Sequence, residues 1–552
     1  MLPFTTYLVE DSMVSKLSNV SERSSQSTEK QPHRTEDDIV PPPELKASAN
    51  PVRVLVIGAG SRGCAYAEAI RGFPNAHVVA VAEPDAFKRE QFSERYCIER
   101  ERSEGVLFAD WKEFIDYEKQ RRLRAQTGSP TVEPGVDAVF VCVLDEMHRE
   151  VVVALSELGG LHIMCEKPLA TNLDDCMEMY TALEKNQDKV FSIGHVLRYS
   201  PHNMALRKLL LEDRVIGDIL SINHTEPVGW WHFTHSYVRG NWRREDTSAP
   251  SLLTKSCHDI DVLLWILCSP PSYTNSSTPP HVPSTVSSTG ALQLFKKSRK
   301  PASAGNATNC LSCPIEPECK YSAKRIYVTD QLNGLGTGNT NWPVKIVVPD
   351  IETYDQGEER QSVLLTKLAE NYTPSTPDSV ISSRNWFGRC VWESDNDVCD
   401  EQVVTMTWDE DPVSGSLQNR GAKTATFHMV AHTKKICERY THIYGVDGEI
   451  YADGQTITIE DFNTGNTRVV HPRQESFGHG GGDVGLARQF ILAVDKVKNH
   501  GWQAQKAQRE IVRCTLDEVI RSHAMVFCAE EARKGRKVLD WRNWWDAKVG
   551  AL

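Results

Sequence analysis

The stretch VRVLVIGAGSRG, residues 52–63, decides the fold of this chain. An apolar run predicts a buried strand, and Gly58, Gly60 and Gly63 then match the spacing G-x-G-x-x-G. The amphipathic residues that follow, CAYAEAIRGF, predict a helix. Glycines in such a turn let backbone N–H groups approach a pyrophosphate, which the positive end of the helix also attracts. We therefore predict a dinucleotide-binding loop, which also contains Ser61 and Arg62.

An acidic residue follows the loop at the distance that ribose recognition requires. The predicted strand HVVAVAE ends in Glu83, 20 residues beyond Gly63. A carboxylate at such a position accepts hydrogen bonds from the adenosine ribose hydroxyls. Because it would repel a 2′-phosphate, Glu83 favours NAD over NADP as the cofactor. NADP stays open as an alternative, since Lys88 and Arg89 follow closely.

The order of strand-like and helix-like segments predicts an α/β fold with two domains. Strand patterns at 78–82, 138–143 and 162–165 alternate with helical patterns such as 151–158, which indicates a parallel sheet covered on both faces. We expect an N-terminal Rossmann domain over residues 51–172. Residues 1–50 are rich in Ser, Glu, Lys and Pro, a composition typical of a disordered tail.

The second half of the chain has a different pattern of polar and apolar residues. Polar and apolar residues alternate between glycine turns, as in antiparallel hairpins, and helical patterns occur at 252–267, 485–497 and 505–534. We therefore expect a C-terminal α+β domain over residues 173–540 with a large open, mostly antiparallel sheet. Two inserted loops interrupt it, at residues 269–290 and 300–400.

Composition restricts the class of protein and its partners. The chain has 552 residues with a net charge of −12 and no long basic run, which argues against a nucleic-acid partner. Its apolar runs are shorter than the roughly 18 to 20 residues that span a bilayer, and no secretory signal is recognisable. Most of the 15 cysteines stand singly, which is typical of reduced thiols. We expect a cytoplasmic protein with no membrane partner.

Three further motifs complete a family resemblance. These are CEKPLA at 165–170, GHVLRYSP at 194–201, and a later His-x-x-Asp on a predicted helix. Together with the glycine loop they resemble the Gfo/Idh/MocA oxidoreductase family over roughly residues 51–540. The resemblance implies a Rossmann domain, a C-terminal domain with an open sheet, and hydride transfer to or from sugars or cyclitols. It also implies a homo-oligomer, a dimer or tetramer packed through that sheet.

The resemblance assigns roles around the cofactor. It implies that Lys167 lies beside the nicotinamide and hydrogen-bonds the reacting hydroxyl, where an ammonium stabilises developing alkoxide charge. Glu166 is expected to pair with a neighbouring charge at the cofactor site. His148, in LDEMHREV, matches a histidine that helps to shape the cofactor pocket. A structural histidine at a helix start is the open alternative for His148.

The segment SLLTKSCHDIDVLLWIL, residues 251–267, predicts a helix with a polar face beside its apolar stripe. Imidazole titrates near neutral pH, and the resemblance implies that His258 takes the substrate proton. Thr254 stands where sugar dehydrogenases of this type often carry an aspartate, so Lys255 beside it is a candidate second cation or proton donor. Asp261, on the same polar face, is a candidate substrate contact.

An aromatic and basic segment supplies further substrate candidates. In HFTHSYVRGNWRR, residues 232–244, rings suited to stacking on sugar faces lie among groups that bind hydroxyls or carboxylates. The candidates are His235, Tyr237, Arg239 and Trp242, with Tyr199 of LRYSP as a weaker one. An ordinary loop between sheet elements is the alternative explanation for this segment.

A cysteine cluster predicts a metal site. Cys310, Cys313 and Cys319 have the spacing C-x2-C-x5-C, which suits tetrahedral thiolate ligation. The fourth ligand must come from elsewhere, and we prefer Cys390 to Cys399. Structural zinc is the expected metal. An iron–sulfur cluster, free thiols or a disulfide are the alternatives.

These observations favour an NAD(P)-dependent dehydrogenase that acts on a CH–OH group of a sugar, sugar derivative or cyclitol. A glycosidase that oxidises its sugar transiently with tightly held NAD is a second possibility. A non-catalytic dinucleotide-binding sensor is a third, against which intact Lys167 and His258 weigh.

Overall fold

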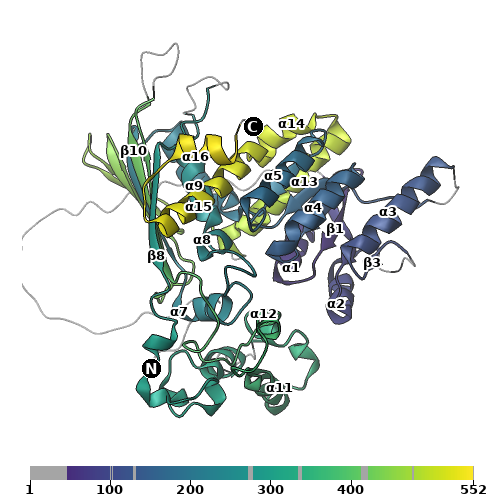
Figure 1. Cartoon of the computed structure of the whole chain (residues 1–552). Helices are drawn as coiled ribbons and strands as arrows, with labels where there is room; N and C mark the ends of the chain where they lie inside the picture. Colours follow the sequence, from purple (N-terminus) through teal and green to yellow (C-terminus); the bar gives the residue numbers. More distant parts are fainter. Residues whose placement is uncertain are drawn as a thin grey trace, which may run out of the picture.

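The computed structural model describes residues 47–99, 101, 104–128, 132–270, 278–333, 339–411, 420–474 and 478–550. Two sheets organise these residues, and a smaller helical body lies beneath them in the view of Figure 1. Nearly all of the predicted tail, 1–50, falls outside the described residues. None of the described helices combines the length and apolar composition that crossing a membrane requires.

The first sheet confirms the predicted Rossmann architecture. Its six strands run parallel in the order β3-β2-β1-β4-β5-β6. Helices lie on both faces, so the inner strands are buried throughout. The strands are β1 Val52–Ile57, β2 Ala76–Ala82, β3 Leu107–Phe108, β4 Ala138–Val141, β5 His162–Cys165 and β6 Phe191–Ile193.

The helices of this domain begin where the sequence provides caps. Asp85, Asp110 and Asn172 each accept hydrogen bonds from backbone N–H groups of the first turn that follows. The sheet extends beyond the expected boundary at residue 172, because β6 still pairs with β5. The helices are α1 Ser61–Ile70, α2 Ala86–Tyr96, α3 Trp111–Gln126, α4 His148–Leu158 and α5 Leu173–Glu184.

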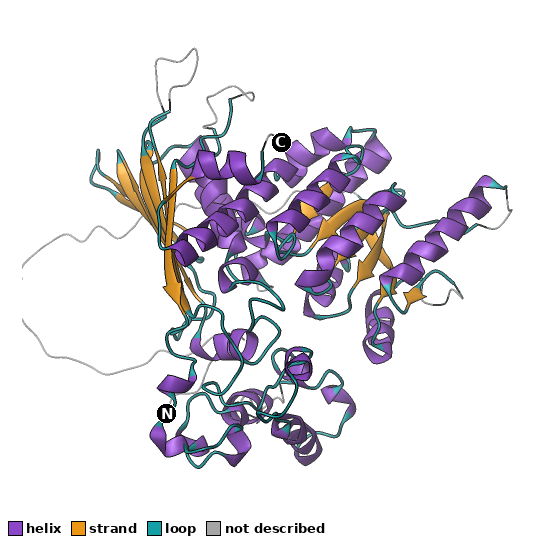
Figure 2. Ribbon diagram, viewed as in Figure 1, coloured by secondary structure: helices purple, strands orange, loops and turns teal. Residues whose placement is uncertain are grey.

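The second sheet confirms the open, mostly antiparallel expectation. Its nine strands have the order β14-β13-β12-β11-β7-β10-β9-β8-β15, and only β7 and β10 pair in parallel. In Figure 2 helices pack on one of its faces, and no described helix covers the other. The strands are β7 Ile219–Pro227, β8 Thr285–Ala291, β9 Glu401–Trp408, β10 Lys423–Val430, β11 Tyr440–Gly445, β12 Gly448–Ala452, β13 Ile457–Asp461, β14 Thr467–Val470 and β15 Leu539–Asp540.

Three segments differ from the sequence prediction. The loop expected at 269–290 contains the start of strand β8, while 271–277 lie outside the described residues. The helix expected at 252–267 breaks at Lys255 and Ser256 into two helices. The helix expected at 505–534 begins afresh near 516, because Thr515 and Glu518 form a capping box. The helices here are α6 Pro201–Arg207, α7 Trp230–Phe233, α8 Ser251–Thr254, α9 Cys257–Leu267, α13 Gly482–His500, α14 Ala504–Ala507, α15 Leu516–Gly535 and α16 Trp541–Lys548.

Residues 297–400, which we call the inserted module, have a small core of their own. Ile326, Tyr327, Leu364 and Leu368 are buried in it, under a more exposed surface. The module contains α10 Val344–Val347, α11 Glu358–Ala369, α12 Asp378–Ser382 and a π-helical stretch at Lys324–Asn333. It is therefore a packed body and not a simple loop.

The C-terminal helices join the two domains. Helix α13 packs on the first sheet, where the ring of Phe490 meets that of Phe140 edge-on at 5.3 Å between centroids. Its apolar residues belong to the same core as β1 and β4. The relative position of the domains is thus fixed by shared apolar burial.

Two buried histidines predict a pH-dependent stability. The ring nitrogens of His162 and His523 accept hydrogen bonds from Val190 N and Leu169 N, and burial lowers both pKa values to about 3. The unfolded chain takes up these protons near pH 6.5, so stability falls as the pH drops below that value. Each ring should lower the free energy of unfolding by about 1.4 kcal/mol between pH 7.5 and pH 5.5, and urea unfolding can measure this change.

The variant His523→Gln tests this directly, because glutamine offers an acceptor to Leu169 but does not titrate. Its loss of stability between the two pH values should be smaller than that of the wild type by about 1.4 kcal/mol. An equal loss in both proteins would contradict the prediction.

Candidate active site at the domain boundary

The glycine loop is shaped for close backbone approach. Gly58 has φ +95°, and a Cβ there would lie 2.4 Å from the carbonyl oxygen of Cys142. A Cβ at Gly63 would lie 2.0 Å from the carbonyl oxygen of Gly58, so neither position accepts a side chain. Gly60 is exposed with no heavy atom within 4 Å of its Cβ position, and Ser61 begins α1. The loop therefore offers open backbone at a helix N-terminus.

Glu83 lies against this loop from the end of β2. Its Oε2 accepts a hydrogen bond from Ala59 N at 2.8 Å, and its Oε1 accepts one from Asp85 N at 3.0 Å. Arg89 donates to the backbone oxygen of Glu83. A ribose hydroxyl can still reach the remaining lone pairs of this carboxylate.

Arg62 was predicted to contact the cofactor, but its side chain pairs with two carboxylates of the protein. Its Nε lies 2.7 Å from Glu166 Oε1, and its Nη2 lies 2.8 Å from Asp483 Oδ1 at the start of α13. Tyr66 also donates to Glu166, at 2.5 Å. Although burial opposes it, Arg62 and Lys167 hold the pKa of Glu166 below its ordinary value. The guanidinium therefore bridges the two domains. It also supplies the charge pairing that was expected for Glu166.

Lys167 projects from the same turn toward the second domain. Its Nζ donates to the backbone oxygen of Thr254 at 2.5 Å and lies 5.6 Å from the ring centroid of Trp242. Trp242 in turn donates from Nε1 to Asp145 Oδ2 at 2.9 Å. The ammonium is therefore held where the two domains meet, with donor capacity left for a ligand.

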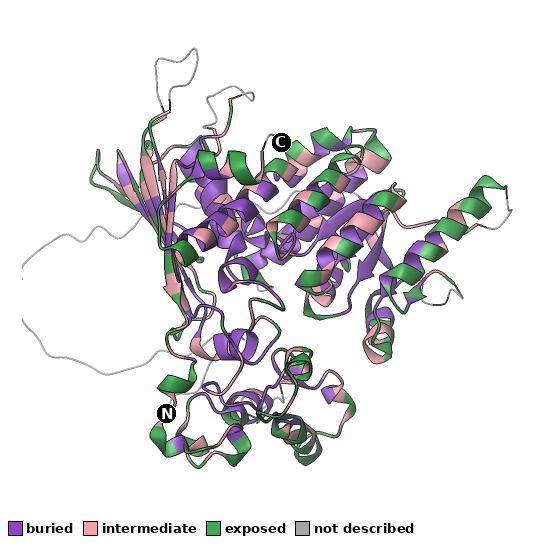
Figure 3. Ribbon diagram, in the orientation of Figure 1, coloured by how far each residue is buried: buried purple, intermediate pink, exposed green. Residues whose placement is uncertain are grey.

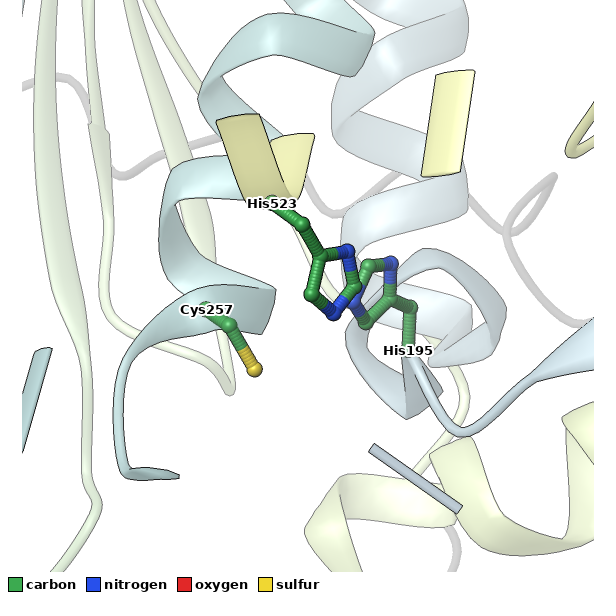
Figure 4. A group of neighbouring side chains, drawn as sticks. All are labelled: His195, Cys257 and His523. Atoms are coloured by element: carbon green, nitrogen blue, oxygen red, sulfur yellow. The ribbon is translucent and has the colours of Figure 1, made fainter. Parts of the chain in front are cut away.

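Histidines support the turn that carries Lys167. His148 Nδ1 lies 2.7 Å from Pro168 O, and His523 Nε2 accepts from Leu169 N. His195 stacks on His523 at 5.3 Å, with Cys257 beside them (Figure 4). In the described part of the chain this trio is the only group whose potential ligand atoms lie within 4.8 Å of one another. His523 already uses both ring nitrogens on backbone groups, so the trio is better explained as a support than as a metal centre.

The geometry of His258 differs from that of a free base. Arg439 Nη2 lies 3.0 Å from His258 Nε2, and an arginine can only donate there. Burial lowers the pKa of His258 well below its usual value, and the charges of Arg439 and Lys167 lower it further. The ring is therefore neutral with its proton on Nδ1, which has no partner among the described residues. Such a ring donates a hydrogen bond more readily than it accepts a proton.

Lys255 is not free to relay a proton as predicted. Its Nζ lies 2.9 Å from Glu226 Oε1 and 3.0 Å from Cys437 Sγ. Burial by itself would lower the pKa of Lys255, but Cys437 and Glu226 raise it above the ordinary value. Glu226 also pairs with Arg439 at 3.0 Å. The lysine is part of a buried ion network that keeps it charged.

Four predicted substrate contacts are engaged within the protein instead. The Tyr199 hydroxyl donates to Val512 O, and the buried Asp261 carboxylate pairs with Arg198 at 2.6 Å. His235 and Arg239 point into the inserted module, where they bond Tyr327 Oη, Arg389 O and Tyr321 O. Each of these side chains is nearly or fully buried.

Two aromatic candidates remain beside Lys167. Trp242 is half-buried at Lys167, and the ring of Tyr237 stacks on it with 5.6 Å between centroids. Tyr237 itself is only 2% exposed, so Trp242 offers the accessible ring surface.

The sequence analysis missed Asp145, Arg439 and His479. Arg439 comes just before β11, and pairing of Tyr440 with Thr225 brings it beside Glu226. A signal existed in β7, where His224 and Glu226 occupy the inward positions that apolar residues normally fill. His479 bonds Asp483 at 3.0 Å and lies 6.2 Å from the ring of His258. Nothing local in the sequence links His479 or Asp145 to the site.

The four predicted metal ligands line one pocket of about 330 Å³ in the inserted module. Backbone hydrogen bonds from Cys310 N to Gly388 O and from Cys390 N to Thr308 O bring Cys390, which is distant in sequence, to the other three cysteines. Arg239 Nη2 lies 3.4 Å from Cys310 Sγ. Cys390 is among the residues that line this pocket and Cys399 is not.

Comparison with known proteins agrees with this fold. Residues 52–195 match the model of the oxidoreductase family with an NAD-binding Rossmann fold. A solved structure of levoglucosan dehydrogenase with NADH and levoglucosan covers 89% of this chain and 99% of its own, with a TM-score of 0.54 and 15% identity. At that identity the likeness concerns the fold.

Curated relatives match over the first domain. The chain is 33% identical over 142 residues to a 1,5-anhydro-D-fructose reductase of Ensifer adhaerens, covering 25% of this chain and 40% of that protein. It is 31% identical over 132 residues to a 2,7-anhydro-N-acetylneuraminate hydratase of Escherichia coli strain K12, covering 24% and 34%. These matches therefore span less than half of either relative. Residues 52–195 are thus the part of this chain that is similar to the oxidoreductase family with an NAD-binding Rossmann fold.

Proposed function

We propose that this protein is an NAD-dependent dehydrogenase that acts on a hydroxyl group of a sugar, sugar derivative or cyclitol. The observation that carries the proposal is the meeting of Lys167 and His258 from different domains. Lys167 bonds the backbone of Thr254, four residues before His258, and its charge contributes to the lowered pKa of that ring. The open glycine loop of the first domain fits a dinucleotide pyrophosphate.

The two residues have complementary roles in this proposal. A bound nicotinamide supplies the hydride acceptor. Lys167 donates a hydrogen bond from its ammonium to the reacting oxygen and stabilises the alkoxide charge that develops as the hydroxyl proton passes to water, and the proton returns from water during reduction. His258 donates a hydrogen bond from Nδ1 to the reacting oxygen, since Arg439 occupies Nε2. This assignment replaces the expected proton transfer to His258, because a neutral ring held by a cation is a poor base.

Four observations support the choice of cofactor, substrate and compartment. The carboxylate of Glu83 at the glycine loop favours NAD over NADP. Trp242 beside Lys167 offers an aromatic surface of the kind that stacks on sugar rings, and the curated relatives are named for sugar-derived compounds. All 15 cysteines are free thiols, which supports a reducing compartment such as the cytoplasm.

Replacing Lys167 tests the mechanism. In a screen of sugars and polyols with NAD, the wild type should produce NADH, read by absorbance. Lys167→Met should lower kcat for the active substrate by about 100-fold or more, because the charge that stabilises the developing alkoxide is lost. Binding of NADH should be nearly unchanged, since the glycine loop and Glu83 remain.

Lys189→Met is the matched control, because Lys189 pairs with its neighbour Asp188 on the surface and should keep full activity. Release of a free sugar without net NADH would instead identify the glycosidase reaction. A Lys167→Met enzyme with unchanged kcat would contradict the mechanism.

We also propose that Cys310, Cys313, Cys319 and Cys390 hold a structural zinc ion. The four cysteines line one pocket, and thiolates are common ligands of structural zinc. Because Cys310 and Cys390 come from opposite ends of the inserted module, zinc would clip the module closed.

Metal analysis of the purified chain should find about one zinc ion per chain. Cys310→Ser and Cys390→Ser should each lose the metal and lower the melting temperature of the module. Cys399→Ser should retain it, because Cys399 is not at the pocket. Absence of metal from the wild type with its thiols reduced would contradict the proposal.

The uncovered face of the second sheet supports a homo-oligomer. Tyr440 and Tyr444 of β11 and Tyr451 of β12 are 50%, 37% and 49% exposed. Such an aromatic patch is costly to leave in water, and a second copy of the same face would cover it.

Light scattering should give at least twice the mass of one chain for the wild type, and Tyr451→Asp should reduce it. Phe462→Asp is the control, since Phe462 is 58% exposed but lies in the turn after β13. A monomeric wild type would contradict this proposal.

A further inference from the structure

The inserted module contacts both domains. On the side of the second domain, His235 bonds Tyr327 and Arg239 bonds the backbone of the module. On the side of the first domain, Gln91 of α2 donates from Nε2 to Glu352 Oε1 at 2.5 Å. Lys345 of α10 donates to Gln91 Oε1 at 2.8 Å and also pairs with Glu352. We call Gln91, Lys345 and Glu352 the clasp.

The clasp lies near the end of the site that serves adenosine. Helix α2 follows Glu83, whose carboxylate lies on the glycine loop. The charges of Lys345 and Glu83 both act on the thiol of Cys64, which lies one turn into α1, with Sγ 3.5 Å from Ala59 O. Lys345 is therefore close to the loop and to the ribose-binding carboxylate, although it belongs to a different part of the chain.

The clasp has polar capacity left for a ligand. Lys345 Nζ has three donors and uses two of them on Gln91 and Glu352. Glu352 Oε2 is buried and has no hydrogen-bond partner among the described residues. Burial opposes ionisation of Glu352, but Lys345 and Gln91 lower its pKa, so the carboxylate remains charged. An ammonium with a spare donor suits phosphate or ribose oxygens.

We propose that the inserted module closes over the adenosine half of the dinucleotide site through this clasp and retains the dinucleotide between turnovers. The proposal rests on the proposed dehydrogenase function, since it requires a dinucleotide on the glycine loop. The charged contacts join the module to α2 while the module is anchored on the second domain, so the dinucleotide leaves only after they break. The same arrangement makes Lys345 a contact for the adenosine ribose or the pyrophosphate.

The experiment measures release of NADH from the full chain. NADH is bound first, its affinity is recorded, and its dissociation rate is followed by stopped-flow fluorescence on displacement with excess NAD. Lys345→Met and Gln91→Ala should each accelerate release roughly two- to fivefold, the scale of one partly exposed charged contact. The double variant should release NADH little faster than either single variant, because both changes open the same contact.

Lys367→Met is the matched control. Lys367 lies on α11 of the same module and pairs with Glu370 at 3.0 Å within the module, so its loss should leave the release rate unchanged. NADH binding with equal release rates in the wild type, Lys345→Met and Gln91→Ala would overturn the clasp and leave the dehydrogenase proposal intact. Failure of the wild type to bind NADH or NAD at all would overturn both.

Discussion

The guanidinium of Arg62, shared between two carboxylates, is the interaction on which the site depends. Glu166 belongs to the turn that carries Lys167, Asp483 begins helix α13, and Arg62 lies in the first turn after the glycine loop. One cation thereby fixes three segments that are distant in sequence. Removing one member of such a buried group leaves an uncompensated charge and costs several kcal/mol. The glycine loop, Lys167 and the boundary between the domains are therefore held in one fixed relative arrangement.

A second network of ion pairs lies on the side of the site that the second domain forms. Glu226 lies between Lys255 and Arg439, and Arg439 also pairs with Asp259. These pairings satisfy the buried charges, and they place a fixed cation against Nε2 of His258. Because two cations surround the ring, it stays neutral and acts as a hydrogen-bond donor. The proposed catalysis therefore relies on Lys167 to stabilise the charge on the reacting oxygen.

Residues whose role depends on local pattern were predicted well. The glycine loop, β5 at His162–Cys165 and the doubly wound order follow from apolar runs and glycine spacing. The pairing of Glu166 with a nearby charge was also anticipated. Tyr199, Arg239 and Asp261, which were expected to contact substrate, bond groups within the protein, because residue type indicates what a side chain can bind but not which partner reaches it first.

The sequence by itself determined the backbone plan and the presence of a dinucleotide loop, because strand periodicity and the steric need for glycine act within a few residues. The sequence also predicted a metal site from the spacing and chemistry of four cysteines. Only the tertiary structure decided which charges meet. Arg439 reaches His258 through the pairing of β11 with β7, and Lys345 reaches Gln91 across the inserted module. Electrostatic partners act through space, so their choice depends on the packing of the whole chain and not on local sequence.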